Sequence, residues 1–419
     1  MDVIEIERIE AISNILRIKL RFSSSISKYF TTDTFECVYS EKIDSIDNSI
    51  LVIPVLAQIL PISWLTDAVI MLDSIDKNFY NSIPEIKRGY QNMYPMLSFK
   101  GGMKVNDIVS NTKMNNQRSA SLFSGGLDAI ATLIAHEEEH PDLIMVHGAD
   151  IPYEEKEGWN IALSQNQKIA ELFNLSLRTI ESNFTTFVDQ HNLNRLSLPT
   201  HDNWWHGFQH GFGLLGLCAP LSVIYDYSKL YIASSHTERD NVSCASDPSI
   251  DNYVRFASCR VIHDQYEYNR LQKTLNIVSF SKSKKVYPHL RVCYRNKVGD
   301  NCCRCEKCIR TAAGIVISGE SPEKYGFNKK DIFKNSKLKV ILQLNYSAVP
   351  LWEDMQNYLI ENTDISLPKD LNWLRKCNFH KLRKCNFHKE LYRFHYRAIH
   401  YILRHSSSIK KWMQQKDFI

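Results

Sequence analysis

The sequence lacks the features that mark secreted, fibrous and membrane-spanning chains. Its first residues, MDVIEIERIEAISN, are acidic and carry no apolar core, so no secretory signal is predicted there. The longest apolar run, residues 49–72, is interrupted by two prolines and by polar residues, which favours a buried segment over a membrane span. Only 15 glycines and 13 prolines occur in 419 residues, and this excludes collagen-like and low-complexity chains. Eleven cysteines without a signal predict a cytoplasmic protein in which clustered thiols bind metal more often than they form disulfides.

Apolar patterns predict three segments. Residues 1–115 are expected to form a separate N-terminal α+β module, and residues 116–330 an α/β domain. In the second segment short apolar runs alternate with helical patterns, an order typical of a mostly parallel sheet with right-handed crossovers. Residues 331–419 are expected to form a helical C-terminal region. A chain of this length can hold two or three domains, each with its own core.

Within the first segment the sequence favours a strand, a helix and an irregular boundary. Residues 14–23 alternate between apolar and polar side chains, as a half-buried strand does. Leu65, Val69 and Leu72 recur at helical spacing and predict a helix. Residues 101–117 are polar, so we expect an irregular connection to the next segment there.

The second segment carries the clearest alternation of elements. The expected strands are residues 119–123, 143–149, 176–182 and 230–235, and the expected helices are residues 127–140, 161–175 and 211–227. Ligands bind beyond the carboxyl ends of the strands in open α/β sheets. Ser235, His236 and Glu238 end or follow the last of these strands, so they are candidates for a substrate pocket.

The C-terminal region is strongly basic. Residues 371–419 hold 12 Lys and Arg against 2 Asp and Glu, although the whole chain has a net charge of only +5. The octapeptide LRKCNFHK of residues 374–381 recurs unchanged at 382–389, which indicates a local duplication rather than a solenoid. The duplicated segment has i, i+3 cysteine–histidine pairs that could hold a metal ion, although the repeat explains their spacing without one: Cys377, His380, Cys385 and His388.

The first chemical signal is the stretch LFSGGLDAIA, residues 122–131. A strand followed by glycines and a helix start aims free backbone N–H groups and the positive end of the helix dipole at one point, which suits a phosphate. No Gly-Lys-Ser/Thr follows, so this is not a Walker loop, and the GxGxxG spacing of dinucleotide sites is missing. On these residues alone, a phosphate site and a plain tight turn are equally supported.

The second signal is a cysteine cluster. Cys293, Cys302, Cys305 and Cys308 have the spacing C-x8-C-x2-C-x2-C, and Cys303 is an extra thiol. Four thiolates suit a closed tetrahedral zinc site, and the basic residues around them favour the thiolate form. Redox or sulfur-transfer cysteines and inert packing are the alternatives. Cys302 and Cys303 are adjacent, so their roles could be exchanged.

Together the two motifs carry a family resemblance. The loop FSGGLDA resembles the SGGxDS loop of the PP-loop ATP pyrophosphatases, and the cysteine spacing resembles that of the 7-cyano-7-deazaguanine synthases, the QueC family, among them. The resemblance spans about residues 118–319, and the chain is similar to the longer QueC-like proteins of bacterial anti-phage defence loci. It implies a Rossmann-like PP-loop domain that binds ATP and Mg²⁺. The implied ATP-binding residues are Ser124, Gly125, Gly126, Leu127, Asp128 and Ala129.

The same resemblance implies a chemistry. ATP would adenylate a carboxylate resembling that of 7-carboxy-7-deazaguanine, and ammonia or a protein amine would then form an amide. Asp128 would help to order the metal and phosphates, while Lys273 and Arg310 match residues that contact the substrate carboxylate. A solvated helix position for Lys273 and a structural partner of the zinc loop for Arg310 are the alternatives. Asp2 follows Met1, so no built-in glutaminase of the asparagine-synthetase type is expected, and a partner subunit or an amine substrate would supply nitrogen.

Three features depart from the family pattern, and one of them is residues 234–256, which stand in place of the family's DYSGYPDCR-type loop. The terminal Ser or Thr of the family's SGGxDS loop is Ala129 here, which is expected to weaken phosphate binding without abolishing it. The segment HDNWWHGFQHG replaces the family's Arg-Asn pair. We expect His206 to line the substrate pocket. A core or capping role is one alternative. A metal at His206 and His210 is another, although no second ligand pair lies near them in sequence.

Two other functions stay open. A PP-loop tRNA-modifying enzyme, either a thiolase or a lysidine-type ligase, would use the basic tail and Phe387, Tyr392 and Phe394 to contact RNA. A non-catalytic nucleotide-binding subunit would explain Ala129 and would use the tail for docking.

Overall fold

The computed structural model describes residues 2–112, 117–240, 242–293, 300–329, 331–344 and 346–379. It is an α/β protein that divides into two compact units, each described here by itself. The first unit comprises Met1–Cys302 and Ser321–Asn328, and the second comprises Cys303–Glu320 and the chain from Lys329 onward.

One large mixed sheet organises the first unit. Its strands run in the order β10-β11-β9-β6-β7-β8-β3-β2-β1-β4-β5. Their bounds are β1 Val3–Ile12, β2 Ile15–Phe22, β3 Thr34–Tyr39, β4 Val69–Asp76, β5 Gly102–Val109, β6 Arg118–Leu122, β7 Asp142–His147, β8 Leu177–Ser182, β9 Tyr227–Ala233, β10 Arg255–Phe256 and β11 Cys259–Asp264. Strand β2 and the strands expected near residues 119, 143, 176 and 230 are confirmed.

The strand directions divide the sheet into a parallel centre and an antiparallel seam. Neighbours in the series β11-β9-β6-β7-β8 are parallel, as are β1-β4 and β4-β5. Strand β3 pairs antiparallel with both β8 and β2, and β1 pairs antiparallel with β2. The expected mostly parallel α/β sheet is therefore confirmed. Residues 1–115 and 116–330 contribute strands to this one sheet, and the division into three domains stays a prediction.

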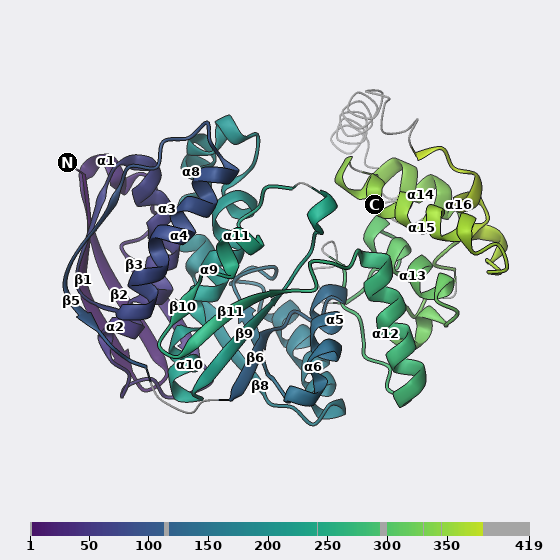
Figure 1. Ribbon diagram of the computed structural model, residues 1–419, viewed down its shortest axis with the longest axis horizontal. Helices are drawn as coiled ribbons and strands as arrows, with labels where there is room; N and C mark the ends of the chain where they lie inside the picture. Colours follow the sequence, from purple (N-terminus) through teal and green to yellow (C-terminus); the bar gives the residue numbers. More distant parts are fainter. Residues whose placement is uncertain are drawn as a thin grey trace, which may run out of the picture. The chain divides into compact units, whose positions relative to one another are not determined.

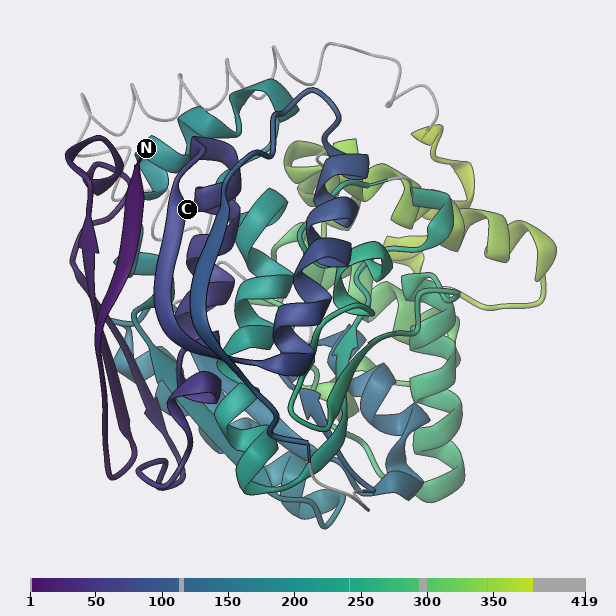
Figure 2. The same ribbon diagram turned by 60° about the vertical axis from the view of Figure 1, so that its left-hand side comes forward.

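Helices of the first unit cover both faces of this sheet (Figure 1). Helices α3, α4 and α9 lie on one side, and α5, α6 and α12 lie on the other. The α-helices of this unit are α1 Ser24–Ser27, α2 Asn48–Leu51, α3 Ile53–Thr66, α4 Lys77–Met93, α5 Leu127–Ala135, α6 Lys156–Leu172, α7 Phe184–Phe187, α8 Gln190–Leu196, α9 His210–Leu217, α10 Ala219–Ile224, α11 Pro248–Asp251 and α12 Arg270–Lys284. Figure 2 brings the N-terminal strands, drawn in purple, forward and shows them alongside the helices that they cover.

Shorter turns of helix connect these elements. The 3-10 helices are η1 Glu137–Glu139, η2 Leu198–Thr200, η4 Glu238–Asp240 and η5 Pro322–Tyr325, and η3 Trp205–Gln209 is a π-helix that leads into α9.

Helix α3 lies at the centre of the hydrophobic core, because every residue from Ile53 to Trp64 is buried. Its partner is α9, which approaches closely through glycines. A Cβ at Gly216 would lie 2.4 Å from the Cβ of Ala57. The side-chain amide of Gln58 donates through Nε2 to the Gly213 carbonyl at 2.9 Å. The longest apolar run is thus a core helix rather than a surface element.

Two sequence predictions for this region were wrong. Val69 and Leu72 lie in strand β4, not in a helix, because Asp67 adopts a left-handed conformation with φ of 59° and ends α3. Apolar residues spaced three and four apart can also fit a strand when their neighbours complete the alternation, and buried Ile70 and exposed Met71 do so. The polar stretch expected to be irregular contains strand β5, which pairs with β4 along most of its length.

One helical stretch of the described chain, Trp205–Ile224, has the length and hydropathy of a membrane-spanning helix. However, 78% of it is buried inside the protein. Packing against α3 therefore accounts for its apolar composition.

The second unit is helical in its described part, as expected for residues beyond 330. Its α-helices are α13 Glu306–Ile317, α14 Ser336–Gln343, α15 Val349–Glu361 and α16 Trp373–Lys376, and its 3-10 helices are η6 Tyr346–Ala348 and η7 Lys369–Leu371. Trp352 is fully buried and packs against Trp373 and Phe379. The duplicated segment beyond Phe379, with His380, Cys385 and His388, lies outside the described residues.

Candidate functional site

The glycine loop connects β6 to α5 with the geometry that its sequence requires. Gly125 has φ of +73°, a left-handed conformation that favours glycine, and a Cβ there would lie 2.2 Å from Oδ1 of Asn166. The loop is held from the other side by Arg291, whose backbone N donates to the Gly125 carbonyl at 2.8 Å. Nε of Arg291 also donates to the Ser124 carbonyl at 3.1 Å. The loop is therefore a fixed backbone structure.

The start of helix α5 presents polar groups near this loop. Gly126 is the N-cap, and no side chain caps the first turn. The helix dipole therefore adds partial positive charge at an end whose first backbone N–H groups have no side-chain cap. Oδ1 of Asn166, a fully buried residue beside the loop, has no hydrogen-bond partner within the described structure. Leu127 and Ala129 are both buried.

Asp128 is the centre of a charged cluster built from distant segments. Its Oδ2 accepts from Nη2 of Arg270 at 2.9 Å and lies 3.5 Å from Oγ of Ser235. Its Oδ1 lies 3.7 Å from Nζ of Lys273. The strands β6 and β9 are parallel neighbours, so the loops that carry Asp128 and Ser235 meet at the same edge of the sheet. The structure thus brings three predicted site residues together.

Lys273 is almost completely buried, with 1% of its surface exposed. Its ammonium donates to the Ser234 carbonyl at 2.6 Å. Burial lowers the pKa of Lys273, while the Asp128 carboxylate opposes that change. The alternative of a solvated helix position for Lys273 is therefore wrong.

Arg270 is a residue that sequence reasoning missed. Helix α12 begins with a capping box in which Asn269 and Gln272 hydrogen-bond reciprocally. Arg270 and Lys273 are then three residues apart on one face of the helix, and both point to Asp128. The capping box and the i, i+3 spacing were visible in the sequence, but their partner was not.

The expected pocket residues fall into two groups. Ser235 and Glu238 are exposed. His236 is partly buried, and burial together with the nearby Arg270 lowers its pKa. His206 lies in η3, where its Nδ1 is 2.6 Å from Oδ2 of Asp202. The ring of His210 instead packs edge-on against Trp205, so the described structure gives no metal pair of His206 with His210.

Arg310 belongs to the second unit, in helix α13. Its Nε donates to Oε1 of Glu306 at 2.7 Å, and the same oxygen accepts from Nε1 of Trp352 at 2.7 Å. Only 7% of Arg310 is exposed. This contact fits the structural alternative, and contact with a substrate carboxylate stays a prediction.

The cysteine cluster is compatible with a zinc site. The Sγ atoms of Cys293, Cys302, Cys305 and Cys308 lie within 4.8 Å of one another. Tetrahedral thiolate ligation needs sulfur atoms roughly 3.8 Å apart, so a small closure would complete the site. Cys303 is not among the four and has φ of 53°. The described structure thus favours Cys302 over Cys303 as the ligand.

We expect Cys305→Ser to remove about one zinc ion per chain. Cys305 is also the N-cap of α13, and its Sγ accepts from the Cys308 backbone N. Loss of a structural metal should lower the free energy of unfolding by about 4 kcal/mol or more. Metal analysis and chemical denaturation measure both effects. The matched control is Cys303→Ser, and equal zinc loss in that variant would contradict this ligand set.

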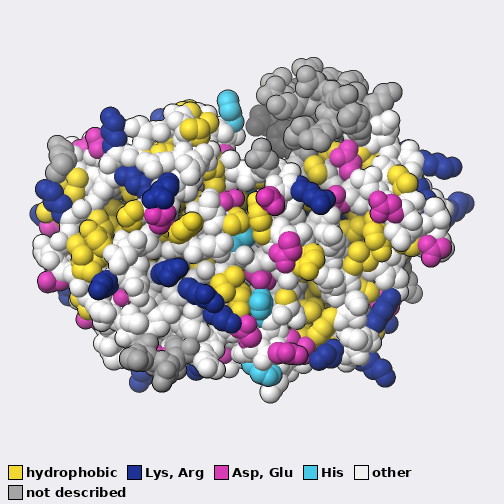
Figure 3. Space-filling view, in the orientation of Figure 1, with side chains coloured by type: hydrophobic (Ala, Val, Ile, Leu, Met, Phe, Trp, Pro, Cys, Tyr) yellow, Lys and Arg dark blue, Asp and Glu magenta, His cyan; other side chains and the backbone are white. Residues whose placement is uncertain are grey.

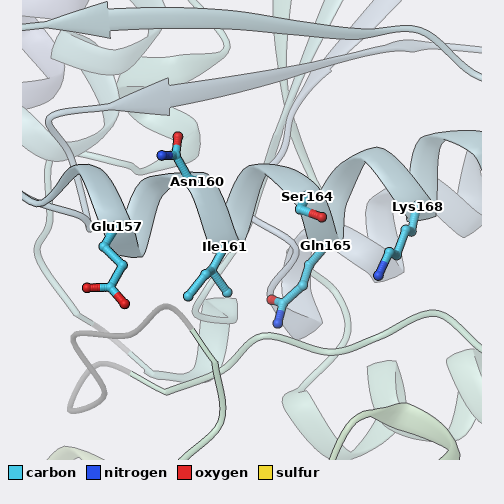
Figure 4. A pocket seen from close by; sticks show the side chains of 6 residues that line it. All are labelled: Glu157, Asn160, Ile161, Ser164, Gln165 and Lys168. Carbon is cyan, nitrogen blue, oxygen red and sulfur yellow. The ribbon is translucent and has the colours of Figure 1, made fainter.

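An open pocket of about 680 Å³ runs along helix α6 in the first unit. Figure 4 shows that most of its lining side chains project from one side of the helix. The lining residues are Glu157, Asn160, Ile161, Ser164, Gln165 and Lys168. None of them is a predicted site residue. However, Asn166, which contacts the glycine loop, follows Gln165 directly, so the pocket and the loop share this helix.

The face shown in Figure 3 gives little support to a nucleic-acid interface in the described residues. On the face shown in Figure 3, Lys and Arg side chains are interspersed with Asp and Glu rather than gathered into one stripe. A basic stripe is the usual electrostatic feature of such interfaces. The aromatic residues expected to contact RNA, namely Phe387, Tyr392 and Phe394, lie outside the described residues.

Comparisons with protein-family models, with curated protein sequences and with solved structures found no match to this chain. The chain itself presents an eleven-stranded α/β sheet, a charged cluster at one edge of it, and four cysteines compatible with zinc.

Proposed function

We propose that this protein is an ATP-dependent carbon–nitrogen ligase of the QueC-like, PP-loop type. It would adenylate a small carboxylate resembling 7-carboxy-7-deazaguanine and pass the acyl group to ammonia or a protein amine. The observation that carries the proposal is the approach of Lys273 to Asp128, at 3.7 Å, beside the Ser-Gly-Gly loop. A buried lysine at a strand–glycine–helix turn suits a reaction in which anionic phosphates and a carboxylate meet.

The proposed reaction has two balanced steps. A carboxylate oxygen attacks the α-phosphorus of ATP, the bond to the β-phosphate bridge breaks, and pyrophosphate leaves. The amine nitrogen then attacks the acyl carbon, AMP leaves, and the amine loses a proton to solvent. Mg²⁺ bound with ATP would offset part of the developing pyrophosphate charge. A bound zinc at the four cysteines would be structural and would take no part in either step.

The residues of the loop have separate tasks in this proposal. Backbone N–H groups from Ser124 to Leu127 would face the phosphates, together with the positive end of α5. The Arg291 contacts would keep the loop in its binding conformation before ATP arrives. Lys273 would attract the negative charge of the phosphates and of the substrate carboxylate beside Asp128. Arg270 would limit the movement of the Asp128 carboxylate.

Radiolabelled ATP provides the direct test. The full-length protein with Mg²⁺, 7-carboxy-7-deazaguanine and ammonia should release labelled AMP and pyrophosphate in equal amounts. The same mixture without the carboxylate is the control and should release neither. If a panel of carboxylates and amines yields no AMP above that control, the ligase proposal is wrong.

We expect Ala129→Ser to tighten MgATP binding by about 2- to 12-fold, which corresponds to one neutral hydrogen bond. Ala129 lies in the first turn of α5, where a hydroxyl could reach a phosphate oxygen. Calorimetry of ATP binding measures the change. Ala135→Ser, at the exposed far end of the same helix, is the matched control and should leave the affinity unchanged. Identical affinities for both variants and the unmodified protein would argue against a phosphate site at this turn.

A second candidate is a nucleotide-binding subunit without catalysis. The observation in its favour is that Asp128 already contacts two cations, Arg270 and Lys273, which leaves its charge less suited to hold Mg²⁺. This function predicts that ATP binds but no AMP forms with any acceptor. Calorimetry and the radiolabel assay on the same sample distinguish the two functions.

A further inference from the structure

Three metal-binding side chains meet at a place that is separate from the four-cysteine cluster. His206, His236 and Cys244 each offer one donor atom, and these atoms lie within 4.8 Å of one another. The residues come from η3, from the segment after β9, and from the segment before α11. The sequence gives them no ligand spacing, so no motif would have found them.

The orientation of His206 is fixed by a carboxylate. Nδ1 of its ring lies 2.6 Å from Oδ2 of Asp202, which leaves Nε2 as the atom available to an ion. Metal-binding histidines usually bind a carboxylate or carbonyl through the second ring nitrogen in this way. His206 also lies in a π-helix, a costly helix form that occurs frequently at functional sites.

Cys244 is held at His206 by the backbone. The Ala245 N donates to the His206 carbonyl at 2.8 Å. Glycine at position 211 makes this approach feasible, since a Cβ there would lie 2.4 Å from the Ala245 carbonyl oxygen. The backbone directly after Cys244 is therefore anchored before any ion binds.

A buried network supports the same loop further along. Oγ of Ser246 donates to Oδ2 of Asp251 at 2.8 Å, and that oxygen is also 2.8 Å from Nδ1 of His263. Asp251 is fully buried, and His263 is nearly so. A rigid support of this kind keeps ligands within a few tenths of an ångström of the geometry that an ion requires.

We propose that His206, His236 and Cys244 bind a second Zn²⁺ ion and leave its fourth coordination position open. Two imidazoles and one thiolate form a donor set that suits zinc, whereas Mg²⁺ and Ca²⁺ select oxygen ligands. Tetrahedral coordination by two nitrogens and one sulfur needs donors roughly 3.3–3.6 Å apart, so the cluster, whose donors lie within 4.8 Å of one another, has to contract by about 1.5 Å at most. Three protein ligands with an open position are the arrangement of catalytic rather than structural zinc sites.

Binding has a defined proton balance. The Cys244 thiol now donates to the Ser246 carbonyl, so the thiol proton leaves to solvent as the Zn–S bond forms. The open position would take water or an oxygen of an anionic ligand. His236 follows Ser235, whose hydroxyl is 3.5 Å from Asp128. If the ion binds the substrate carboxylate, that part of the inference rests on the proposed ligase function, but the metal site itself does not.

Metal analysis of the full-length protein, purified after growth with added zinc, tests the site without any assay of activity. We expect about two zinc ions per chain, one at each cluster. Cys244→Ser and His236→Gln should each lower the content to about one ion. His201→Ala, an exposed histidine of the segment before η3, is the matched control and should retain both ions. Thermal unfolding of each variant shows whether it is folded.

Cobalt distinguishes the two sites. Co²⁺ added to the zinc-free protein should give thiolate charge-transfer absorption that falls by about a fifth in Cys244→Ser, because one of the five cobalt–sulfur bonds is lost. Cys305→Ser should remove the larger part. Zinc content that is the same in folded Cys244→Ser, in folded His236→Gln and in the unmodified protein would overturn the site. If folded Cys244→Ser and His236→Gln still bind two zinc ions, the second ion lies elsewhere and the proposed site is wrong.

Discussion

Gly125→Ala is expected to destabilise the protein by roughly 2–5 kcal/mol. The left-handed conformation at φ +73° costs about 1–2 kcal/mol for an alanine. The new Cβ would also lie 2.2 Å from Oδ1 of Asn166, a contact that forces either α6 or the loop to move. Because Gly125 and Asn166 are both buried, neither can move without cost. Chemical denaturation of the purified variant measures the change in the free energy of unfolding.

The neighbouring glycine provides the matched control for this prediction. Gly126 has φ of −76°, and a Cβ there would lie 3.2 Å from the Ser124 hydroxyl, which can rotate away. Gly126→Ala should therefore cost less than about 1 kcal/mol. Adding Asn166→Ala to Gly125→Ala should recover the part of the loss that comes from the contact. If both single glycine variants lose the same stability, the loop does not have this conformation.

Lys273→Met is expected to lower the rate of pyrophosphate release by about 10²- to 10³-fold, as removal of one preorganised charge donor does. Methionine keeps most of the side-chain volume in a site of which 1% is exposed. Asp128 retains its contact with Arg270, so the carboxylate is not left without a cation. The radiolabel assay gives the rate, and calorimetry shows whether ATP still binds.

Lys284→Met is the matched control for Lys273→Met. It removes the same charge from the last turn of the same helix, at a side chain that is 56% exposed. Its rate should equal that of the unmodified protein. A Lys273→Met variant that is folded and fully active would contradict the role proposed for Lys273, while loss of rate in both variants would indicate a general effect of charge.

Structural features that depend on residues close in sequence could be predicted from local sequence patterns. Strand β6, the glycines and helix α5 follow one another directly, so the turn at Gly125 could be inferred. The four cysteines lie within sixteen positions, so their cluster could also be inferred. In each case the partners are close in sequence and their spacing reflects their chemistry.

Contacts between distant segments could not be predicted in the same way. Arg270 reaches Asp128 across 142 positions, and nothing near either residue identifies the other. His206, His236 and Cys244 are brought together by a π-helix and two loops, which have no periodicity to recognise. The strand β4 was mistaken for a helix because apolar residues at 65, 69 and 72 satisfy both patterns, and only the backbone at Asp67 decides between them.

The antiparallel seam between β3 and β8 has a consequence for how the chain is made. Cys37 of β3 pairs with Ser182 of β8. Gln58 of helix α3 donates a hydrogen bond to Gly213 of α9, 155 positions further along the chain. During synthesis the N-terminal hairpin and a largely apolar helix therefore emerge long before the segments that cover them. Contacts of such long range slow folding, because the loop must close before the contact forms. The newly made N-terminal third should thus depend on chaperones until residues beyond 217 have left the ribosome.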